Sequence, residues 1–404
     1  MKWEKVKIGD CCEVTSSKRI FFSEYVDSGV PFYRSKEIIE RSNGQAISEP
    51  LFIKQEKYNE IKSSFGVPQP GDMLLTSVGT IGIPYIVQEK DYFYFKDGNL
   101  TWFRNFDDKL NSRYLYFWIK SSEGQGVLNN TTIGSSQKAL TIASLKGLEI
   151  PCPPTPIQNR IVEILAAYDD LIENNQKQIK LLEEAAQRLY KEWFVDLRFP
   201  GHENVKIVDG VPEGWKRYKF SERASIMSGG TPKTDIKEYY NGDIPFYTPK
   251  DCDGSFFAFD TIVHISESGL EHCNSQHYPV GTVIITARGT VGKTTILAVP
   301  MAMNQSCYAL KCDELNSPYY LFFSLNREVA ALKTMANGGV FNTIIAKTFD
   351  SIYLTIPPKE ILTAFDATVS LMMEQIKAKM QQNMTLAEVR DRLLPKLMSG
   401  ELEV

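Results

Sequence analysis

PCPPTPIQNRIVEILAAYDDLIENNQKQIKLLEEAAQRLYKEWFVDLRFPG, residues 151–201, is the segment around which the rest of the chain is organised. A proline-rich lead-in precedes a long run that contains neither proline nor glycine, and this run stops at Pro200-Gly201. Proline is tolerated at the start of a helix and glycine favours its end, so both borders fit one uninterrupted helix. At about 1.5 Å per residue, such a helix is on the order of 60 Å long. A helix of this length in mid-chain is typical of a spacer or a strut.

Apolar residues recur along this run at helical spacing, in rows whose members are seven residues apart. The rows are Ile161, Tyr168, Asn175, Leu182 and Leu189; Ile164, Leu171, Gln178 and Ala185; and Leu165, Ile172, Ile179 and Ala186. Together they form a stripe that is wide enough to pack against another helix.

The composition is that of an ordinary globular protein. The chain has 404 residues, of which 43% are hydrophobic and 23% charged, and this length favours two or three domains. No apolar run approaches the length of a membrane span, and the N-terminal residues lack the apolar core of a signal peptide. The seven cysteines form no regular framework, as in a reduced compartment, so we expect a cytoplasmic protein. The net charge of -4 means that any anion-binding surface is local or shared with a partner.

The two halves of the chain resemble each other, with Trp3 matched by Trp215. Further matches pair Val30–Glu37 with Ile244–Asp251, Pro70–Gly82 with Pro279–Gly292, Tyr114–Lys120 with Tyr319–Leu325, and Pro153-Pro154 with Pro357-Pro358. The period is far longer than that of a solenoid repeat, so a whole module is duplicated.

A second long helix is predicted after the second Pro-Pro pair and ends at Gly400. Its apolar rows are Leu362, Val369, Ile376 and Asn383, and Phe365, Met372, Lys379, Leu386 and Leu393. The globular parts mix short β-branched and aromatic runs, such as Met73–Thr76, Val283–Thr286 and Tyr92–Phe95, with helical stretches such as Ser112–Ser121. We therefore predict an α+β fold: two similar globular domains, residues 1–155 and 215–357, with spacer helices at 156–199 and 358–404, a linker at 200–214, and antiparallel pairing of the helices as a coiled coil.

Each predicted helix carries an asparagine in a core row near its midpoint, Asn175 in one and Asn383 in the other. In an antiparallel pair related by a pseudo-twofold axis the two midpoints meet. A buried Asn pair would then set the register of the helices at some loss of stability. The alternative is that each Asn faces solvent through a gap in the stripe.

The motifs at the borders of the modules resemble those of the specificity subunit of type I restriction-modification systems. They are PCPPTPIQNRIVEIL (151–165), LYKEWFVDLRFPG (189–201), VPEGW (211–215), SGGTP (228–232) and ARGTVGKT (287–294). The resemblance covers the whole chain. It implies two target recognition domains that alternate with two conserved helical regions. One departure is that the first half has TSVGTIGI where the second carries Arg and Lys.

The resemblance also implies a role and partners. Subunits of this family have no catalytic activity; they bind double-stranded DNA and two methyltransferase subunits and, through these, restriction subunits. S-adenosylmethionine is then expected in the methyltransferase partner, ATP and Mg²⁺ in the restriction partner, and no cofactor in this chain. We expect a bipartite, asymmetric DNA target, because the two domains are diverged copies. Half-sites on one face of B-DNA lie about 34 Å apart, and the helix length would act as a ruler between them. The alternatives are a coiled-coil adaptor with two protein-binding heads and a P-loop ATPase.

Polar residues in matching loops of the two copies are the candidates for DNA contact. Arg suits guanine, Asn and Gln suit adenine, and Lys and Ser mostly hold phosphates. In the first copy the candidates are Lys18, Arg19, Arg34, Ser35, Lys36, Ser77, Thr80, Ser135, Ser136, Gln137 and Lys138. In the second copy they are Gly229, Gly230, Thr231, Lys233, Thr248, Lys250, Arg288, Thr290, Lys293, Asn342 and Thr343.

Other chemistries fit the sequence less well. The segment Ala287–Thr294 fits a loose phosphate-binding loop, but the β-like residues that follow it provide no helix, and its counterpart in the first half lacks the Lys. His272, Cys273 and His277 lie close together without the paired Cys-x-x-Cys spacing of a zinc site, so no metal is expected. The sequence shows neither a methyltransferase pocket with its (Asp/Asn/Ser)-Pro-Pro-aromatic loop nor a nuclease carboxylate cluster.

Overall fold

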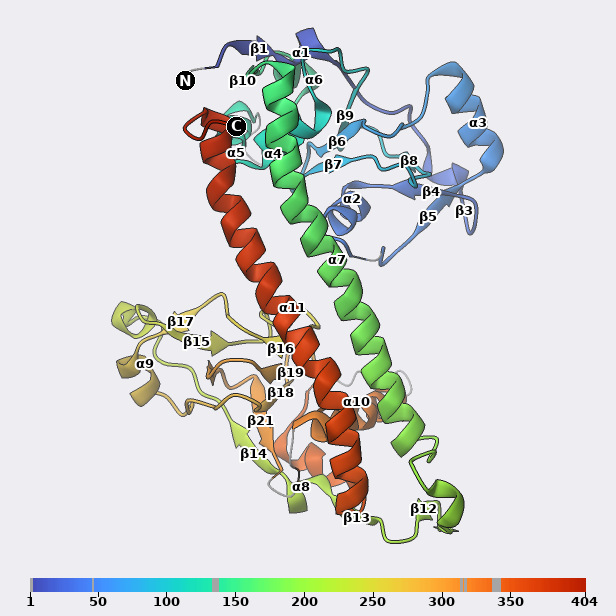
Figure 1. Ribbon diagram of the computed structural model, residues 1–404, viewed down its shortest axis with the longest axis vertical. Helices are drawn as coiled ribbons and strands as arrows, with labels where there is room; N and C mark the ends of the chain where they lie inside the picture. The colour runs from blue at the N-terminus through green and yellow to red at the C-terminus, as the bar shows by residue number, and fades with distance from the viewer. Residues whose placement is uncertain (1–2, 46, 133–137, 313–314, 316–317, 336–342) are drawn as a thin grey trace. The chain divides into compact units, whose positions relative to one another are not determined.

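The computed structural model describes residues 3–45, 47–132, 138–312, 315, 318–335 and 343–404. The chain forms two compact units (Figure 1). The first unit contains Met1–Asn174 and Asn383–Val404, and the second contains Asn175–Gln382. Each of the two long helices, α7 (Thr155–Phe194) and α11 (Lys359–Ser399), therefore contributes to both units.

Two four-stranded sheets and a two-stranded pair build the first unit. One sheet has the strand order β2-β9-β6-β7, all antiparallel, with β2 (Glu13–Thr15), β9 (Leu100–Arg104), β6 (Met73–Thr76) and β7 (Pro84–Ile86). The other has the order β3-β5-β4-β8, with β3 (Tyr25–Val26), β5 (Leu51–Ile53), β4 (Val30–Tyr33) and β8 (Tyr94–Phe95). In this sheet β4 and β8 are parallel, so the carboxyl ends of both strands meet at one edge. Strands β1 (Lys5–Lys7) and β10 (Glu149–Pro151) pair separately.

Short helices cover these sheets in the first unit. They are α1 (Ile8–Cys11), the 3₁₀ turn η1 (Phe22–Glu24), α2 (Ser35–Ser42), α3 (Gln55–Ser64), α4 (Ser112–Lys120), α5 (Ser122–Thr131) and α6 (Ile142–Lys146). Helix α4 begins where the side chain of Asn111 accepts from the amide of Arg113 at 2.8 Å, a bond typical of an N-cap. Its apolar face, with Tyr114 and Trp118 fully buried, belongs to the same core as β6 and the start of α7.

The second unit repeats this topology. Its main sheet has the order β14-β21-β18-β19-β16, with β14 (Ser225–Ser228), β21 (Cys307–Lys311), β18 (Val283–Thr286), β19 (Thr294–Leu297) and β16 (Phe257–Ala258). A second sheet, β17-β15-β20, contains β17 (His264–Ile265), β15 (Ile244–Tyr247) and β20 (Ala302–Met303), and here β15 is parallel to β20 as β4 is to β8. The pair β13 (Lys216–Lys219) and β22 (Tyr353–Ile356) corresponds to β1 and β10.

The remaining elements of the second unit are helical, apart from one hairpin. The helices are η2 (His202–Asn204), α8 (Phe220–Arg223), η3 (Lys237–Tyr240), α9 (Glu267–Glu271), α10 (Pro318–Met335) and η4 (Ala346–Ser351). The hairpin consists of β11 (Ile207–Val208) and β12 (Val211–Pro212).

The long helices pack antiparallel within each unit. In the second unit Asn175 bonds to Gln382, whereas the ring of Phe194 lies 4.9 Å from that of Phe365. Later residues of α7 therefore contact earlier residues of α11, as expected of antiparallel helices. In the first unit Asp169 of α7 forms an ion pair with Arg390 of α11. The buried residues of both helices join the cores of the globular parts, so the apolar stripes are covered on two sides.

The ends of the long helices differ in part from the prediction. Helix α7 ends at Phe194 and not at residue 199, because the chain turns where Leu197 takes a positive φ of 59°. The amide of Asp196 closes the turn by donating to the carbonyl of Lys191 at 2.8 Å. Helix α11 ends as expected: Gly400 has φ +72°, and a Cβ there would lie 2.8 Å from the ring of Trp3.

Helix α11 also continues through Pro395, a residue that the prediction of a single helix did not take into account. Proline removes one backbone donor, so one hydrogen bond of the last turns is missing. Burial of Leu394, Leu397 and Met398 in the first unit's core holds these turns in place.

Most of the predicted short elements are present. Strands β6 and β18 have the predicted bounds, and the predicted strand at 92–95 is confined to Tyr94–Phe95. Helix α4 matches the stretch expected at 112–121. The predicted α+β class and the duplication of a whole module are confirmed. Within the described residues, no helix is both long and apolar enough to span a membrane.

Candidate nucleic-acid interface

The first loop, Ser77–Gly82, joins β6 to β7 and is held by its own backbone. The amide of Gly82 donates to the carbonyl of Thr76 at 2.8 Å, and the amide of Ile83 donates to the hydroxyl of Thr76 at 2.9 Å. One threonine at the end of a buried strand therefore closes the loop. Gly79 and Thr80 form its exposed tip.

The second loop, Ala287–Gly292, joins β18 to β19 with the same bonds. The amide of Gly292 donates to the carbonyl of Thr286 at 2.7 Å, and the amide of Lys293 donates to the Thr286 hydroxyl at 3.0 Å. Gly292 has φ +72°, and a Cβ there would lie 2.6 Å from Val329 of α10, so only glycine fits. The exposed tip here carries Arg288 and Thr290. The two loops are copies of one rigid turn that present different side chains.

Three of the predicted segments of the first unit meet at the turn between β8 and β9, and a fourth bonds to one of them. The carbonyl of Asn99 accepts from the amide of Ser77 at 2.8 Å and from the hydroxyl of Ser35 at 3.4 Å. In the same turn Asp97 accepts from Arg19 at 2.8 Å. Leu140 donates to the carbonyl of Ser77 at 2.9 Å, which brings the neighbouring Lys138 to the first loop. Residues far apart in the sequence thus surround one loop.

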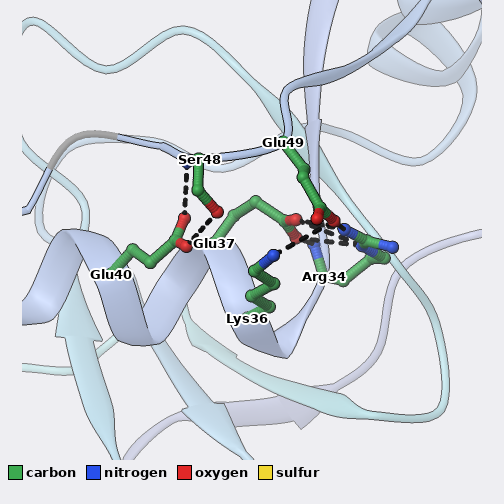
Figure 2. Close-up of polar contacts among 6 residues, drawn as sticks. All are labelled: Arg34, Lys36, Glu37, Glu40, Ser48 and Glu49. Carbon is green, nitrogen blue, oxygen red and sulfur yellow. Dashed lines mark hydrogen bonds and ion pairs between the residues drawn. The ribbon is translucent and has the colours of Figure 1, made fainter. Parts of the chain in front are cut away.

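The predicted cations of the first unit differ in whether a carboxylate pairs with them, and Figure 2 shows the two paired cations Arg34 and Lys36. Arg34 is half-buried and bonds to Glu37, whose side chain is fully buried, and these hydrogen bonds raise the pKa of Arg34. Figure 2 shows the ion pair between Lys36 and Glu49, in which Nζ of Lys36 lies 3.0 Å from Oε2 of Glu49. Because carboxylates already satisfy both cations, this geometry favours a structural role for them. Lys18 and Lys138 are exposed and form no ion pair within the described ranges.

The corresponding segments of the second unit meet at the turn between β20 and β21. Ala287 donates to the carbonyl of Ser306 at 2.7 Å, and Thr231 bonds to Gln305. The hydroxyl of Thr290 donates to the carbonyl of Pro249 at 3.3 Å, which places the segment with Thr248 and Lys250 beside the second loop.

This second surface has the more accessible positive charge. Its candidate cations, Lys233, Lys250, Arg288 and Lys293, are all exposed, and in the part of the chain that the structure describes they form no ion pair. Thr248 is held in its turn by Asp251, whose Oδ2 accepts from the Thr248 amide at 2.8 Å and from its hydroxyl at 2.7 Å. Thr343 is exposed next to Ile344, whose amide donates to the carbonyl of Ala287 at 2.9 Å.

Three predicted contact residues are enclosed by the protein. Ser77 is 2% exposed, and its hydroxyl lies 2.7 Å from that of Thr101. A Cβ on Gly229 would lie 2.3 Å from two backbone carbonyl oxygens, and one on Gly230 would lie 2.6 Å from the amide nitrogen of Asn274. These glycines permit close backbone packing, and Ser77 supports its loop from within. We therefore leave these three out of the proposed surface.

Four other candidates lie outside the described residues: Ser135, Ser136, Gln137 and Asn342. They remain predictions, as does contact with DNA for the exposed candidates.

Sequence reasoning missed the turns on which both loops rest. Asp97 and Asn99 in one unit, and Gln305 and Ser306 in the other, hold the predicted segments together. The Asp-Gly-Asn sequence at 97–99 is a turn signal that could have drawn attention to the first turn. The second turn carries no such glycine.

The segment at 287–294 does not form a nucleotide-binding loop. Such a loop lies between a strand and a helix, whereas here the chain continues directly into strand β19, antiparallel to β18. Among the described residues, no group of three His, Cys, Asp or Glu side chains is placed to hold a metal ion. His272 instead stacks on Tyr239, with ring centroids 5.1 Å apart.

Both copies of the module match a known protein family. The sequence matches the type I restriction modification DNA specificity domain (Methylase_S) over residues 1–184 and again over residues 212–382. The chain belongs to this family. Its members include specificity subunits that match the chain along much of its length, and the two matched regions agree with the internal repeat.

The MjaIX specificity subunit of Methanocaldococcus jannaschii is 28% identical over 420 residues, covering 100% of this chain and 94% of the relative. The HindI specificity subunit of Haemophilus influenzae is 27% identical over 325 residues, covering 65% of this chain and 71% of the relative. A crystal structure of the S subunit from M. genitalium has the same fold, with a TM-score of 0.61, 16% sequence identity, and coverage of 98% of this chain and 96% of that one. The prediction of a type I specificity subunit, and not an enzyme, is confirmed.

Proposed function

We propose that this chain is the DNA-reading, non-catalytic component of a type I restriction-modification complex. The observation that carries the proposal is the duplicated loop. In each unit a rigid turn, closed by the same threonine bonds, projects exposed polar residues at the end of a buried sheet. Backbone rigidity places side chains accurately, and exposed Lys and Arg beside it supply contacts to phosphates and bases.

The target is bipartite and asymmetric. The exposed tip of the first loop is Gly79-Thr80, and that of the second is Arg288-Gly289-Thr290, so the two units present different donors from one scaffold. A neutral tip and a cationic tip favour different bases, because arginine bonds guanine in the major groove. Each unit is expected to read one half-site.

The partners are those expected of a type I specificity subunit, the family to which the chain belongs. Two methyltransferase subunits, with S-adenosylmethionine, supply base modification, and restriction subunits, with ATP and Mg²⁺, join through them in the cytoplasm. Exposed apolar residues on the long helices, such as Leu171, Leu181 and Leu371, are available to partner helices.

The test is to co-express the chain with the methyltransferase encoded beside it and to map modified bases across a genome. The expected result is one asymmetric sequence made of two short half-sites and an unread spacer. If the purified complex binds duplex DNA without sequence preference, or if no methyltransferase co-purifies, the proposal fails and a structural adaptor becomes the better explanation.

A further inference from the structure

Two adjacent phenylalanines of the first unit project into solvent from a rigid turn. Phe22 is 88% exposed and Phe21 is 60% exposed. Single exposed apolar residues are common, but two aromatic rings side by side are costly unless something covers them.

The turn that carries these rings is preorganised. Oε2 of Glu24 accepts from the amide of Phe21 at 2.8 Å, and Lys57 holds the same carboxylate at 3.4 Å. The ring of Phe22 rests edge-on against Tyr25, with centroids 5.5 Å apart, and Tyr25 packs on the buried Phe32. The backbone of Phe21 and the ring of Phe22 are therefore fixed by contacts within the unit, although both side chains are exposed to solvent.

The aromatic turn is continuous with the candidate DNA surface. It follows directly on Lys18 and Arg19, both exposed. The side chain of Arg19 donates to Asp97 at 2.8 Å, in the turn where the carbonyl of Asn99 accepts from the amide of Ser77 of the first loop at 2.8 Å. Two carboxylates also lie here: Glu24 is paired with Lys57 and Asp97 with Arg19, so Lys18 is the cation beside the rings that has no ion pair among the described residues.

The occupant that fits is a nucleic acid duplex. Cations that flank exposed aromatic rings match a ligand with anionic phosphates outside and flat apolar bases inside. We propose that Phe21 and Phe22 form an aromatic wedge that packs against the bases of duplex DNA at the half-site of the first unit, while Lys18 holds an adjacent phosphate. This inference rests on the proposed function.

The wedge belongs to one unit alone. The matching segment of the second unit, η3, has Tyr240 half-buried with its hydroxyl donating to the carbonyl of Pro232 at 2.8 Å. The first half-site should therefore be deformed more than the second, so that base-step flexibility contributes to its recognition.

The test measures binding of the complete complex to a duplex that carries the mapped target sequence, over a range of salt concentrations. Phe22→Ala should weaken binding by about fivefold to a hundredfold, the effect of losing one base–aromatic contact. It should leave the slope of log affinity against log salt unchanged, because no phosphate contact is lost. Lys18→Ala should lower that slope, because it removes a phosphate contact. Ile207→Ala, at a residue 53% exposed in the β11–β12 hairpin, is the apolar control and should change neither quantity.

Three results would overturn the wedge. Phe22→Ala could bind as tightly as the unaltered complex, or the loss could come with a lower salt slope. The variant could also bind DNA normally yet release the methyltransferase, which would make the rings a protein contact. Phe22 is so exposed that its removal should leave the melting temperature unchanged, which separates these results from misfolding. If the unaltered complex does not prefer the mapped duplex, the proposed function itself fails.

Discussion

The side-chain amide of Asn175 in α7 donates a hydrogen bond to Oε1 of Gln382 in α11 at 3.0 Å. Asn175 is 6% exposed, so this amide is buried against the partner helix and does not face solvent. Asn383, the residue after Gln382, is half-buried. Gln382 itself is exposed, but the buried amide of Asn175 needs a hydrogen-bond partner, which favours alignments of the two helices that provide one.

That contact leads to a prediction about register. Changing Asn175 and Asn383 together to leucine should raise the free energy of unfolding by about 1 kcal/mol, because apolar contacts replace a buried amide. The helices should then populate more than one alignment, measurable as a broadened distance distribution between spin labels on α7 and α11. A single, unaltered distance would show that these residues do not set the register.

Arg390 and Asp169 should contribute to the stability of the first unit. Their side chains are only 16% and 26% exposed, so the pair is partly shielded from water. Arg390→Ala should lower the free energy of unfolding by about 1–2 kcal/mol, since it leaves Asp169 without this partner. Arg392→Ala is the control: its side chain is 77% exposed and its pair with Glu388 should be worth less than about 0.5 kcal/mol. Equal losses for both variants, measured by calorimetry, would contradict this ranking.

Arg288 at the tip of the second loop should contribute to affinity and to base preference. Arg288→Ala should weaken binding to the mapped target about tenfold and relax the preference at one position of the second half-site. Lys347→Ala, which removes an exposed cation of the same unit outside the loops, should have a smaller and sequence-independent effect. Unchanged affinity and specificity in a binding assay would remove Arg288 from the proposed surface.

Glu183 should make the second unit more stable in acid than in base. Burial raises the pKa of this α7 carboxyl to about 7; the amide of Phe256 opposes the shift and the charge of Asp253 adds to it. A raised pKa stabilises the fold below the ordinary pKa of glutamate, and this contribution is lost as the pH rises through about 7. Glu183→Gln should therefore be more stable than the unaltered protein at pH 8, by on the order of 1 kcal/mol, with little difference at pH 4. A melting-temperature difference that does not vary with pH would rule this out.

The length of the long helices should determine the spacer of the DNA target. Each helix contributes to both units, so inserting four residues into α7 and four into α11 lengthens the connection between them. The modified bases should then map to half-sites with an altered spacer and unaltered sequences. An unchanged spacer would argue against the ruler.

Apolar periodicity and the bordering Pro and Gly residues were sufficient to predict the two long helices. Helices α7 and α11 follow from long runs of apolar residues at helical spacing, and the module repeat follows from matched strings such as those at 70–82 and 279–292. The exposed tips of the two loops were also identified, because Gly and Thr between two β-branched runs are a local signal.

The sequence by itself thus determined the helices, the duplication and the position of the loops, since each depends on residues close together in the chain. Only the tertiary structure decided which candidate side chains are free. Ser77 is buried against Thr101, Arg34 and Lys36 are paired with Glu37 and Glu49, and Arg288 is exposed without an ion pair in the described part of the chain. The division of each long helix between two units, and the bond from Asn175 to Gln382, were likewise not readable in advance. The physical reason is that burial and pairing depend on segments brought together by packing across long sequence separations, which local patterns do not encode.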